Sequence, residues 1–477
     1  MLINYISFGL TMGRPKLRAL VFWAFATLRV CCVNAQGLDY WVAFEREVEP
    51  ACLVVTLRYV GGATGSDRLT LPAWFNGDTR SLHDFRLRVR GSAWRYAPDS
   101  ATIDVIYPPG DTVLLSYRVA AYRPFTTTGL TLTPSFFVAP GFAFLVAPQW
   151  ERFQPRIRFA QADCRALLPD EVNYPDLRWL ETLCVGGAYR RLQGELAEVW
   201  ITGESWPFAD GDLLQMLENV EQAQRQLWRV ASDAPLSLAL TPTPPPPVAA
   251  QGGSAAHSGP SGIQLGSGLS CFAYPQSLNG VADLEHLLHH EAAHRRIGGD
   301  IREGAEFGNR RWAWMTEGFT EYMALQSRLR AGRLSVGQYV ALLNEAYLRP
   351  YYASALSHID NAQICARYSD PAYAEIAYLR GCILAFYLDM RMQKRDGTRL
   401  SDVLADLARA FGEQGRSMER DFDFFSKKIS APLGSDFMPI YQKHILRGEP
   451  IRNFILPPNL SVRFDAGAVP VLSVQGE

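Results

Sequence analysis

A pair of histidines with an adjacent glutamate constrains this chain more than any other feature. Residues 290–294 read His-Glu-Ala-Ala-His. On an α-helix, side chains four positions apart project from nearly the same face, so His290 and His294 can bind one metal ion. Glu291 beside them can accept a proton from a metal-bound water, the task that this spacing serves in hydrolytic zinc sites. The segment therefore predicts a zinc site with one ion per chain.

A third ligand must come from elsewhere, because hydrolytic zinc usually takes three protein ligands and keeps a position open for water. We predict Glu317 for this role. Thr316 can cap a helix, and residues 317–330 contain few helix breakers, so a second helix can cross the first. Glu321 lies one turn later and is predicted to accept the free ring N–H of a ligating histidine. The alternative for Glu321 is an ordinary solvated carboxylate.

The length and composition bound the class of protein. At 477 residues the chain exceeds what one hydrophobic core usually organises, so two or more domains are expected. Apolar residues make up 48% and charged residues 20%, which is typical of globular proteins. The net charge of −1 provides no basic surface, so a nucleic-acid partner is not expected.

The first 35 residues are predicted to be a secretory signal peptide. Basic residues precede the apolar stretch 19–28, and residues 33–35 form a small-residue cleavage site. Ten apolar residues are too few to span a bilayer, so no membrane span is expected after signal removal. The protein is thus predicted to be exported, to a periplasm or outside the cell. The sequence leaves the true start open between Met1 and Met12.

The two halves of the remaining chain differ in pattern. Residues 36–204 contain short β-branched and aromatic runs separated by Gly and Pro turns, which indicates an antiparallel β-sandwich. Residues 205–477 form the second predicted domain, with helices at 212–230, 335–348, 372–393, 401–411 and 418–428 and a strand at 236–240. The Pro/Gly-rich segment 242–262 is predicted to be an exposed loop within that domain.

Six cysteines follow the predicted signal peptide, and sequence alone allows many pairings. Cys164 with Cys184 is the favoured pair if export leads to oxidation. Unpaired burial is the alternative for each.

The zinc motif and its surroundings resemble the gluzincin metallopeptidases, and the glycyl aminopeptidase family most closely. In the alanyl type the glutamate ligand would fall at Ala313, whereas here the glutamate stands at 317. Residues 71–77, Leu-Pro-Ala-Trp-Phe-Asn-Gly, are similar to a motif of the family's N-terminal β-domain. The resemblance spans roughly residues 39–448. It implies an α+β protein in which a thermolysin-like, mainly helical catalytic domain follows the β-sandwich.

The resemblance also implies roles for individual residues. It assigns His290, His294 and Glu317 as zinc ligands and Glu291 as the general base. Tyr378 lies in the segment Ala-Tyr-Leu-Arg-Gly, which is similar to the segment where gluzincins place a tyrosine that donates a hydrogen bond to the oxyanion. The alternative for Tyr378 is an aromatic residue packed in the core. Tyr373 is a candidate for a supporting part.

One departure from the family concerns the substrate's free amine. Relatives that trim N-termini carry a glutamate on a Gly-rich strand before the zinc helix, and the corresponding stretch here is predicted to be 267–272. Ser270 then replaces the acid, which leaves aminopeptidase and endopeptidase activity both open. Gly268 and Leu269 are predicted to offer a strand edge to an extended peptide.

The sequence thus predicts an exported zinc metallopeptidase that acts on peptides or proteins. The alternative is a protein that keeps the gluzincin scaffold and binds peptides without turnover. The change at Ser270 favours this alternative, whereas the intact Glu291 opposes it. A purely structural protein whose His-rich helix binds no metal is a third possibility. Oligomeric state is left open.

Overall fold

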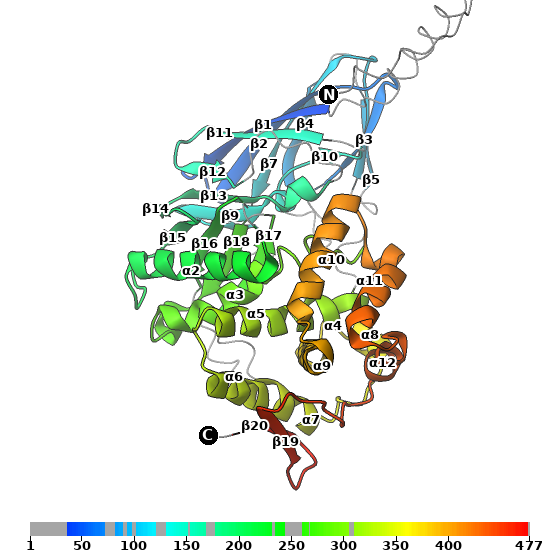
Figure 1. Ribbon diagram of the computed structural model, residues 1–477. Helices are drawn as coiled ribbons and strands as arrows, with labels where there is room; N and C mark the ends of the chain where they lie inside the picture. The colour runs from blue at the N-terminus through cyan, green and yellow to red at the C-terminus, as the bar shows by residue number, and fades with distance from the viewer. Residues whose placement is uncertain are drawn as a thin grey trace, which may run out of the picture.

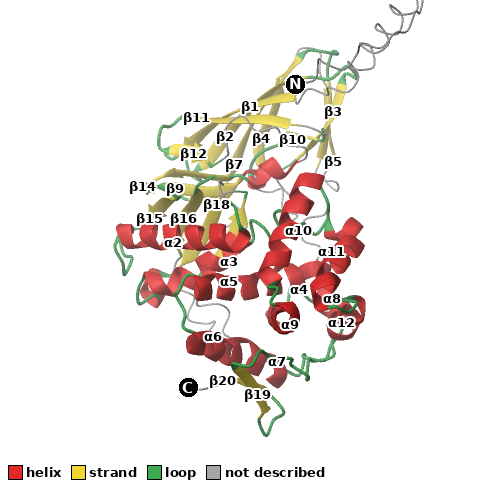
Figure 2. Cartoon of the chain, in the orientation of Figure 1, coloured by secondary structure: helices red, strands yellow, loops and turns green. Residues whose placement is uncertain are grey.

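The computed structural model describes residues 36–71, 82–88, 93–97, 102–120, 130–150, 153–167, 177–230, 234–243, 260–266, 268–304 and 310–475. β-Sheets form one end of the molecule and helices the other, as Figures 1 and 2 show. The predicted signal peptide, most of the 71–77 motif and most of the 242–262 loop lie outside the described residues. None of the described helices combines the length and apolar character needed to cross a bilayer.

Three sheets make up the N-terminal part. Their strand orders are β11-β1-β2-β7-β4, β10-β3-β6-β5 and β12-β13-β9-β8. All pairs between these strands are antiparallel except β1 with β11, which are parallel. The bounds are β1 Gln36–Glu45, β2 Cys52–Val60, β3 Ser66–Thr70, β4 Leu82–Arg88, β5 Ala93–Ala97, β6 Thr102–Ile106, β7 Thr112–Ala120, β8 Thr131–Leu132, β9 Phe136–Pro140, β10 Ala147–Pro148, β11 Phe153–Phe159, β12 Cys164–Ala166 and β13 Leu183–Gly187.

The alternating pattern of these strands places their apolar residues in one core. In β2, Leu53, Val55 and Leu57 are fully buried while the residues between them are less so. The prediction of an N-terminal, mainly antiparallel β region is confirmed. Cys164 and Cys184 lie on the paired strands β12 and β13 as buried free thiols, so the favoured disulfide is not formed.

A fourth sheet, with five strands, is the one on which the helices pack. Its order is β14-β15-β16-β18-β17, with β15, β16 and β18 parallel and the two edge strands antiparallel. The strands β15 and β18 are buried throughout because both faces of the sheet are covered. The bounds are β14 Tyr189–Gln193, β15 Ala197–Thr202, β16 Leu236–Pro242, β17 Ser261–Leu265 and β18 Gly268–Ala273. β14 and β15 precede the domain boundary that the sequence predicts between residues 204 and 205, and the other three strands follow it. One sheet thus contains strands from both predicted domains, and the boundary stays a prediction.

The order of this sheet corrects one expectation from the sequence. Gly268 and Leu269 belong to β18, which is hydrogen-bonded to β16 on one side and to β17 on the other. They therefore offer no free strand edge, and the prediction that they present one to a peptide is wrong. The edge belongs to β17. The run 268–273 is buried throughout, as an interior strand is, but its mainly apolar sequence does not by itself distinguish an interior strand from an edge strand.

The rest of the described chain is mainly helical, as predicted. α2 and α3 lie against the five-stranded sheet, and α5, α9 and α10 lie further from it (Figure 1). A hairpin of β19 and β20 follows the last helix. The bounds are α2 Asp210–Trp228, α3 Glu285–Ala293, α4 Ala313–Thr316, α5 Gly318–Arg330, α6 Val336–Leu342, α7 Arg349–Ala353, α8 Asn361–Ala366, α9 Pro371–Asp396, α10 Leu400–Gln414, α11 Met418–Leu433, α12 Met438–Tyr441, β19 Leu460–Phe464 and β20 Pro470–Val474.

Two glycines let α9 cross the junction of α4 and α5 at very close range. A Cβ atom on Gly381 would lie 1.8 Å from the Trp314 carbonyl oxygen and 2.8 Å from the Gly318 Cα atom. The neighbouring Arg380 is buried and donates to the Ile359 carbonyl at 2.7 Å. Together the glycine contact and the arginine anchor fix the position of α9 relative to the start of α5.

We expect Gly381→Ala to lower the free energy of unfolding by about 1–3 kcal/mol or more, because an added methyl group must displace packed backbone. Gly211→Ala on α2 is the matched control, since a Cβ there meets nothing within 4 Å. Urea unfolding of both variants checks the expectation. Equal stability of the two variants would contradict the proposed crossing.

Candidate metal centre

Three candidate ligands from two helices converge on one point. His290 lies in the last turn of α3, His294 ends that helix, and Glu317 precedes the first residue of α5. The ligand atoms of the three residues all lie within 4.8 Å of one another. The two Nε2 atoms are 3.0 Å apart, and Glu317 Oε2 lies 3.6 Å from that of His290 and 3.4 Å from that of His294.

The environment of the two histidines fits a metal ion. His294 Nδ1 lies 3.0 Å from the Ile297 carbonyl oxygen, and His290 Nδ1 lies 3.1 Å from Glu321 Oε1. A proton on each Nδ1 leaves both Nε2 lone pairs directed toward Glu317 and toward each other. Such lone pairs repel unless they share a cation. Two imidazoles and a carboxylate are a donor set typical of hydrolytic zinc.

The charges in this group support one another. Burial opposes ionisation of Glu317, yet His294 and His290 hold the pKa of its carboxyl below its usual range. Burial likewise lowers the pKa of His290, but Glu321 and Glu317 outweigh it and raise that pKa above its usual value. An ionised Glu317 facing a positive charge is therefore the favoured state of the site.

Glu291 is buried between α3 and the edge strand β17. A Cβ atom on Gly262 would approach Glu291 Cγ to 2.9 Å, so only glycine lets the strand come this near. The pKa of the Glu291 carboxyl is raised, first by burial and then by Glu317 and Glu321, while the two histidines oppose the rise. A carboxyl with a raised pKa beside a metal group is suited to accept and return a proton.

Glu321 holds three partners at once. Besides His290, its carboxylate lies 2.8 Å from His286 Nε2 and accepts a hydrogen bond from the Tyr347 hydroxyl at 2.6 Å. Neither His286 nor Tyr347 was predicted from the sequence to belong to the site. The four-residue interval from His286 to His290 is the sequence signal that could have identified His286. No local signal marks Tyr347, which only the tertiary structure places next to Glu321.

His289, which the sequence analysis also left out of the site, points away from the three ligands. Its Nδ1 lies 2.9 Å from the Ser327 hydroxyl, and the side chain is buried. Burial lowers the pKa of His289 to about 3, so the ring is neutral. His289 therefore links α3 to α5 through a hydrogen bond.

Tyr378 on α9 lies next to His290. Its ring lies parallel to that of His290, at 11° and 6.2 Å between centroids, and burial, followed by the charge of Glu317, raises the pKa of its phenol. Tyr373, the supporting candidate, is directed elsewhere, since its hydroxyl accepts from Arg367 at 2.6 Å.

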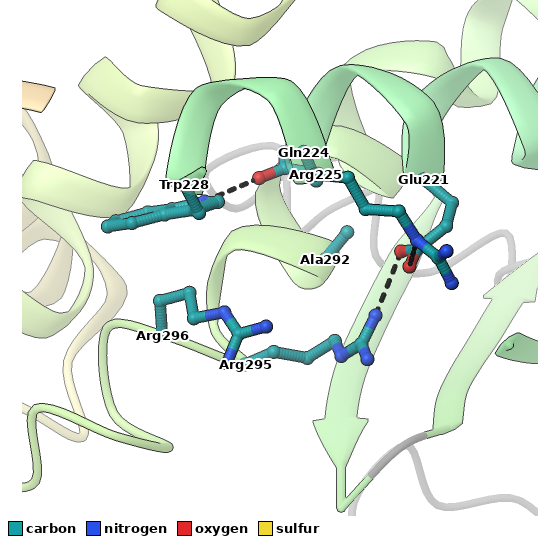
Figure 3. Close-up of a pocket in the computed structure, with 7 residues that line it drawn as sticks. All are labelled: Glu221, Gln224, Arg225, Trp228, Ala292, Arg295 and Arg296. Atoms are coloured by element: carbon teal, nitrogen blue, oxygen red, sulfur yellow. Dashed lines mark hydrogen bonds and ion pairs between the residues drawn. The ribbon is translucent and has the colours of Figure 1, made fainter. Parts of the chain in front are cut away.

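A small pocket lies behind α3, on the side away from the three ligands. Within it Trp228 Nε1 donates to Gln224 Oε1 at 2.8 Å and Arg295 donates to the buried Glu221 at 2.8 Å (Figure 3). Gln224 also donates to the His289 carbonyl oxygen at 3.0 Å. These hydrogen bonds connect α2 to α3, the helix that carries His290, and to the residues that directly follow it.

Two histidines four residues apart on one helix, a glutamate beside them and a third candidate ligand before a following helix form the group that the sequence resemblance predicts. The fold also has counterparts among solved structures. It is similar to the crystal structure of an aminopeptidase N family protein from Idiomarina loihiensis, with a TM-score of 0.68 and 13% identity over 90% of this chain and 79% of that one.

Two structures of yeast LTA4 hydrolase are also similar, each with a TM-score of 0.51. The complex with bestatin is 12% identical over 89% of this chain and 69% of that one, and the native enzyme is 13% identical over 88% and 69%. No protein-family model matches the sequence, and no curated protein does so either. The likenesses show the shared fold. The nearer resemblance to glycyl aminopeptidases stays a prediction.

We expect Glu321→Gln to weaken zinc binding by about 10–100-fold, because hydrogen bonds that orient a ligating histidine contribute about that much to metal affinity. Competition with a chromogenic chelator measures the affinity. Glu345→Gln is the control, since Glu345 is exposed and pairs with Arg349. Unchanged affinity in Glu321→Gln would remove Glu321 from the metal site.

Proposed function

We propose that this protein is a zinc-dependent metallopeptidase that hydrolyses peptide bonds. His290, His294 and Glu317 would hold one zinc ion, which supplies a Lewis acid and lowers the pKa of a bound water to about 7. The observation that carries the proposal is the convergence of these ligand atoms within 4.8 Å of one another, beside the buried Glu291. The fold shared with aminopeptidase N supports it.

The chain's own residues account for the movement of protons. Glu291 accepts a proton from the attacking water as the water oxygen bonds to the peptide carbon. It then delivers that proton to the amide nitrogen as the C–N bond breaks. Tyr378, above the His290 ring, donates a hydrogen bond to the carbonyl oxygen as negative charge develops there. Such a donor lowers the barrier by about 3 kcal/mol.

We propose that the substrate binds along the edge strand β17. Within the part of the chain that the structure describes, β17 pairs on one side only, with β18. Its other edge can hydrogen-bond an extended peptide through main-chain groups. Because Gly262 contacts Glu291, a peptide added at this edge would lie beside the general base.

The side chains of β17 bear on which peptides are cut. Ile263 and Leu265 pack into the N-terminal core, so Gly262 and Gln264 share the face toward α3. Gln264, whose amide donates to the Gly266 carbonyl, thus stands nearer the site than Ser270, which lies on the interior strand. A neutral amide at this position provides no countercharge for a free α-ammonium. This favours cleavage that does not require a free N-terminus.

We expect the purified protein with bound zinc to cleave members of a mixed peptide library, and Glu291→Gln to abolish cleavage while it keeps one zinc per chain. Mass spectrometry of the products and metal analysis are the measurements. Zinc removal by chelator should abolish activity, and added zinc should restore it. A zinc-loaded protein without cleavage would instead favour the peptide-binding alternative, for which the intact Glu291 has no use.

We expect free and N-acetylated versions of one cleaved peptide to react at similar rates. Gln264→Glu should raise the ratio of free to acetylated cleavage by up to about fivefold, because an ion pair that is open to solvent contributes about 0.2–1 kcal/mol. Gln215→Glu, on the exposed face of α2, is the control. A strict requirement for a free amine in the wild type would show that this protein is an aminopeptidase.

Export of the protein also remains a proposal, and it rests on the signal-like residues 1–35. The N-terminal sequence of the protein recovered from outside the cytoplasm would test the predicted cleavage after Ala35.

A further inference from the structure

Tyr347 stands next to Glu321, the carboxylate that faces the candidate zinc ligand His290. It lies in a π-helical turn, Leu343–Leu348, which joins α6 to α7. Turns of this kind are frequent at functional sites. The Tyr347 side chain is buried, and its hydroxyl donates to Glu321 Oε2 at 2.6 Å. Tyr347 thus reaches the metal group through Glu321.

The two oxygens of Glu321 serve different partners. Oε1 lies 3.1 Å from His290 Nδ1, whereas Oε2 lies 2.6 Å from the Tyr347 hydroxyl and 2.8 Å from His286 Nε2. Rotation about the last side-chain bond of a glutamate is otherwise only weakly restricted. Two partners on Oε2 restrict that rotation and keep Oε1 directed toward His290.

Tyr347 is the better shielded of the two partners on Oε2. Its side chain is buried, whereas that of His286 is 36% exposed. Burial, followed by the charge of Glu321, raises the pKa of the Tyr347 phenol, so its hydroxyl keeps the proton that it donates. A hydrogen bond to a charged group is stronger where water is excluded. The Tyr347 hydroxyl therefore contributes most to the orientation of this carboxylate.

The turn that carries Tyr347 is itself fixed from its other side. The Asn344 amide donates to the Leu472 carbonyl at 2.9 Å, and Asn344 Oδ1 accepts from the Leu472 N–H at 2.8 Å. Leu472 belongs to β20, which lies beside α6 (Figure 1). Two bonds from one side chain hold the π-helical turn against the C-terminal hairpin. Tyr347 is thereby supported before any metal binds.

We propose that Tyr347 is a positioning residue of the metal centre: its hydroxyl holds the Glu321 carboxylate toward His290 Nδ1 and so keeps His290 Nε2 directed at zinc. The inference deepens the proposed function and rests on the zinc site within it. In this role Tyr347 touches neither substrate nor metal. Its loss should weaken zinc binding, because the groups that orient a ligating histidine contribute to metal affinity.

Tyr339 provides a matched comparison from the neighbouring helix. It lies on α6, its side chain is buried, and its hydroxyl accepts from Gln326 Nε2 at 2.9 Å. Tyr339→Phe removes the same atom and a comparable buried hydrogen bond. It leaves the contact between Tyr347 and Glu321 in place. The comparison therefore separates an effect on the metal site from a general loss of stability.

The test measures zinc affinity of the full chain by competition with a chromogenic chelator, and the Tm of each zinc-free variant. We expect Tyr347→Phe to weaken zinc binding by about 2–10-fold, a part of the loss of about 10–100-fold that follows removal of an orienting group. Tyr339→Phe should bind zinc as the wild type does, even where its Tm falls equally. Unchanged or tighter binding in Tyr347→Phe, or equal weakening in Tyr339→Phe, would overturn the inference.

A second background decides whether Tyr347 acts through Glu321. In Glu321→Ala, the further change Tyr347→Phe should leave zinc affinity where it is, because the carboxylate that it positions is gone. Independent losses in the double variant would overturn the inference. These affinities do not depend on cleavage, so a zinc-binding protein that cuts no peptide would overturn the peptidase function alone. A wild type that binds no zinc would overturn both.

Discussion

The contact between α3 and α5 is the constraint on which the candidate site depends. Two ligands come from one helix and the third from the other, so the helices must hold a fixed distance. His289 Nδ1 meets the Ser327 hydroxyl at 2.9 Å, and the buried Glu285 accepts from Arg328 at 3.0 Å. These bonds order the ligands before any metal binds, which lowers the entropic cost of assembling the site.

The site is costly to bury, and this bears on what the protein is for. Glu291, Glu317 and Glu321 are close enough for their charges to interact, and burial opposes the ionisation of each carboxyl. Nearby Glu303 has its pKa raised to about 7, mainly by burial. Apolar residues of similar size would often stabilise such a core as well or better. A purely structural role therefore gives no reason for this group, whereas a hydrolytic metal site does.

Helical periodicity made the metal centre predictable from the sequence. The spacing of His290 and His294 placed both rings on one face, and the breaker-free run after Glu317 predicted the second helix. Apolar stripes predicted α9 and its neighbours for the same reason. The parallel pairing of β1 with β11 was not predictable, because strand neighbours far apart in sequence leave no local pattern.

The features of the site that could not be predicted from the sequence depend on contacts between distant segments. Tyr347 carries no local signal in the sequence, and only the packing of the fold brings its hydroxyl to Glu321. The resemblance predicted the strand that faces the site at 267–272, with Gly268 and Leu269 at its edge, yet these two residues belong to the interior strand β18. The true edge, β17, carries Gly262, where a side chain would collide with Glu291. Glycine thus serves the same physical purpose twice: at Gly262 it brings the proposed substrate strand to the base, and at Gly381 it brings the phenol to the ligand. Each close approach requires that no Cβ atom intervene, and this requirement connects the packing of the fold to the chemistry of the site.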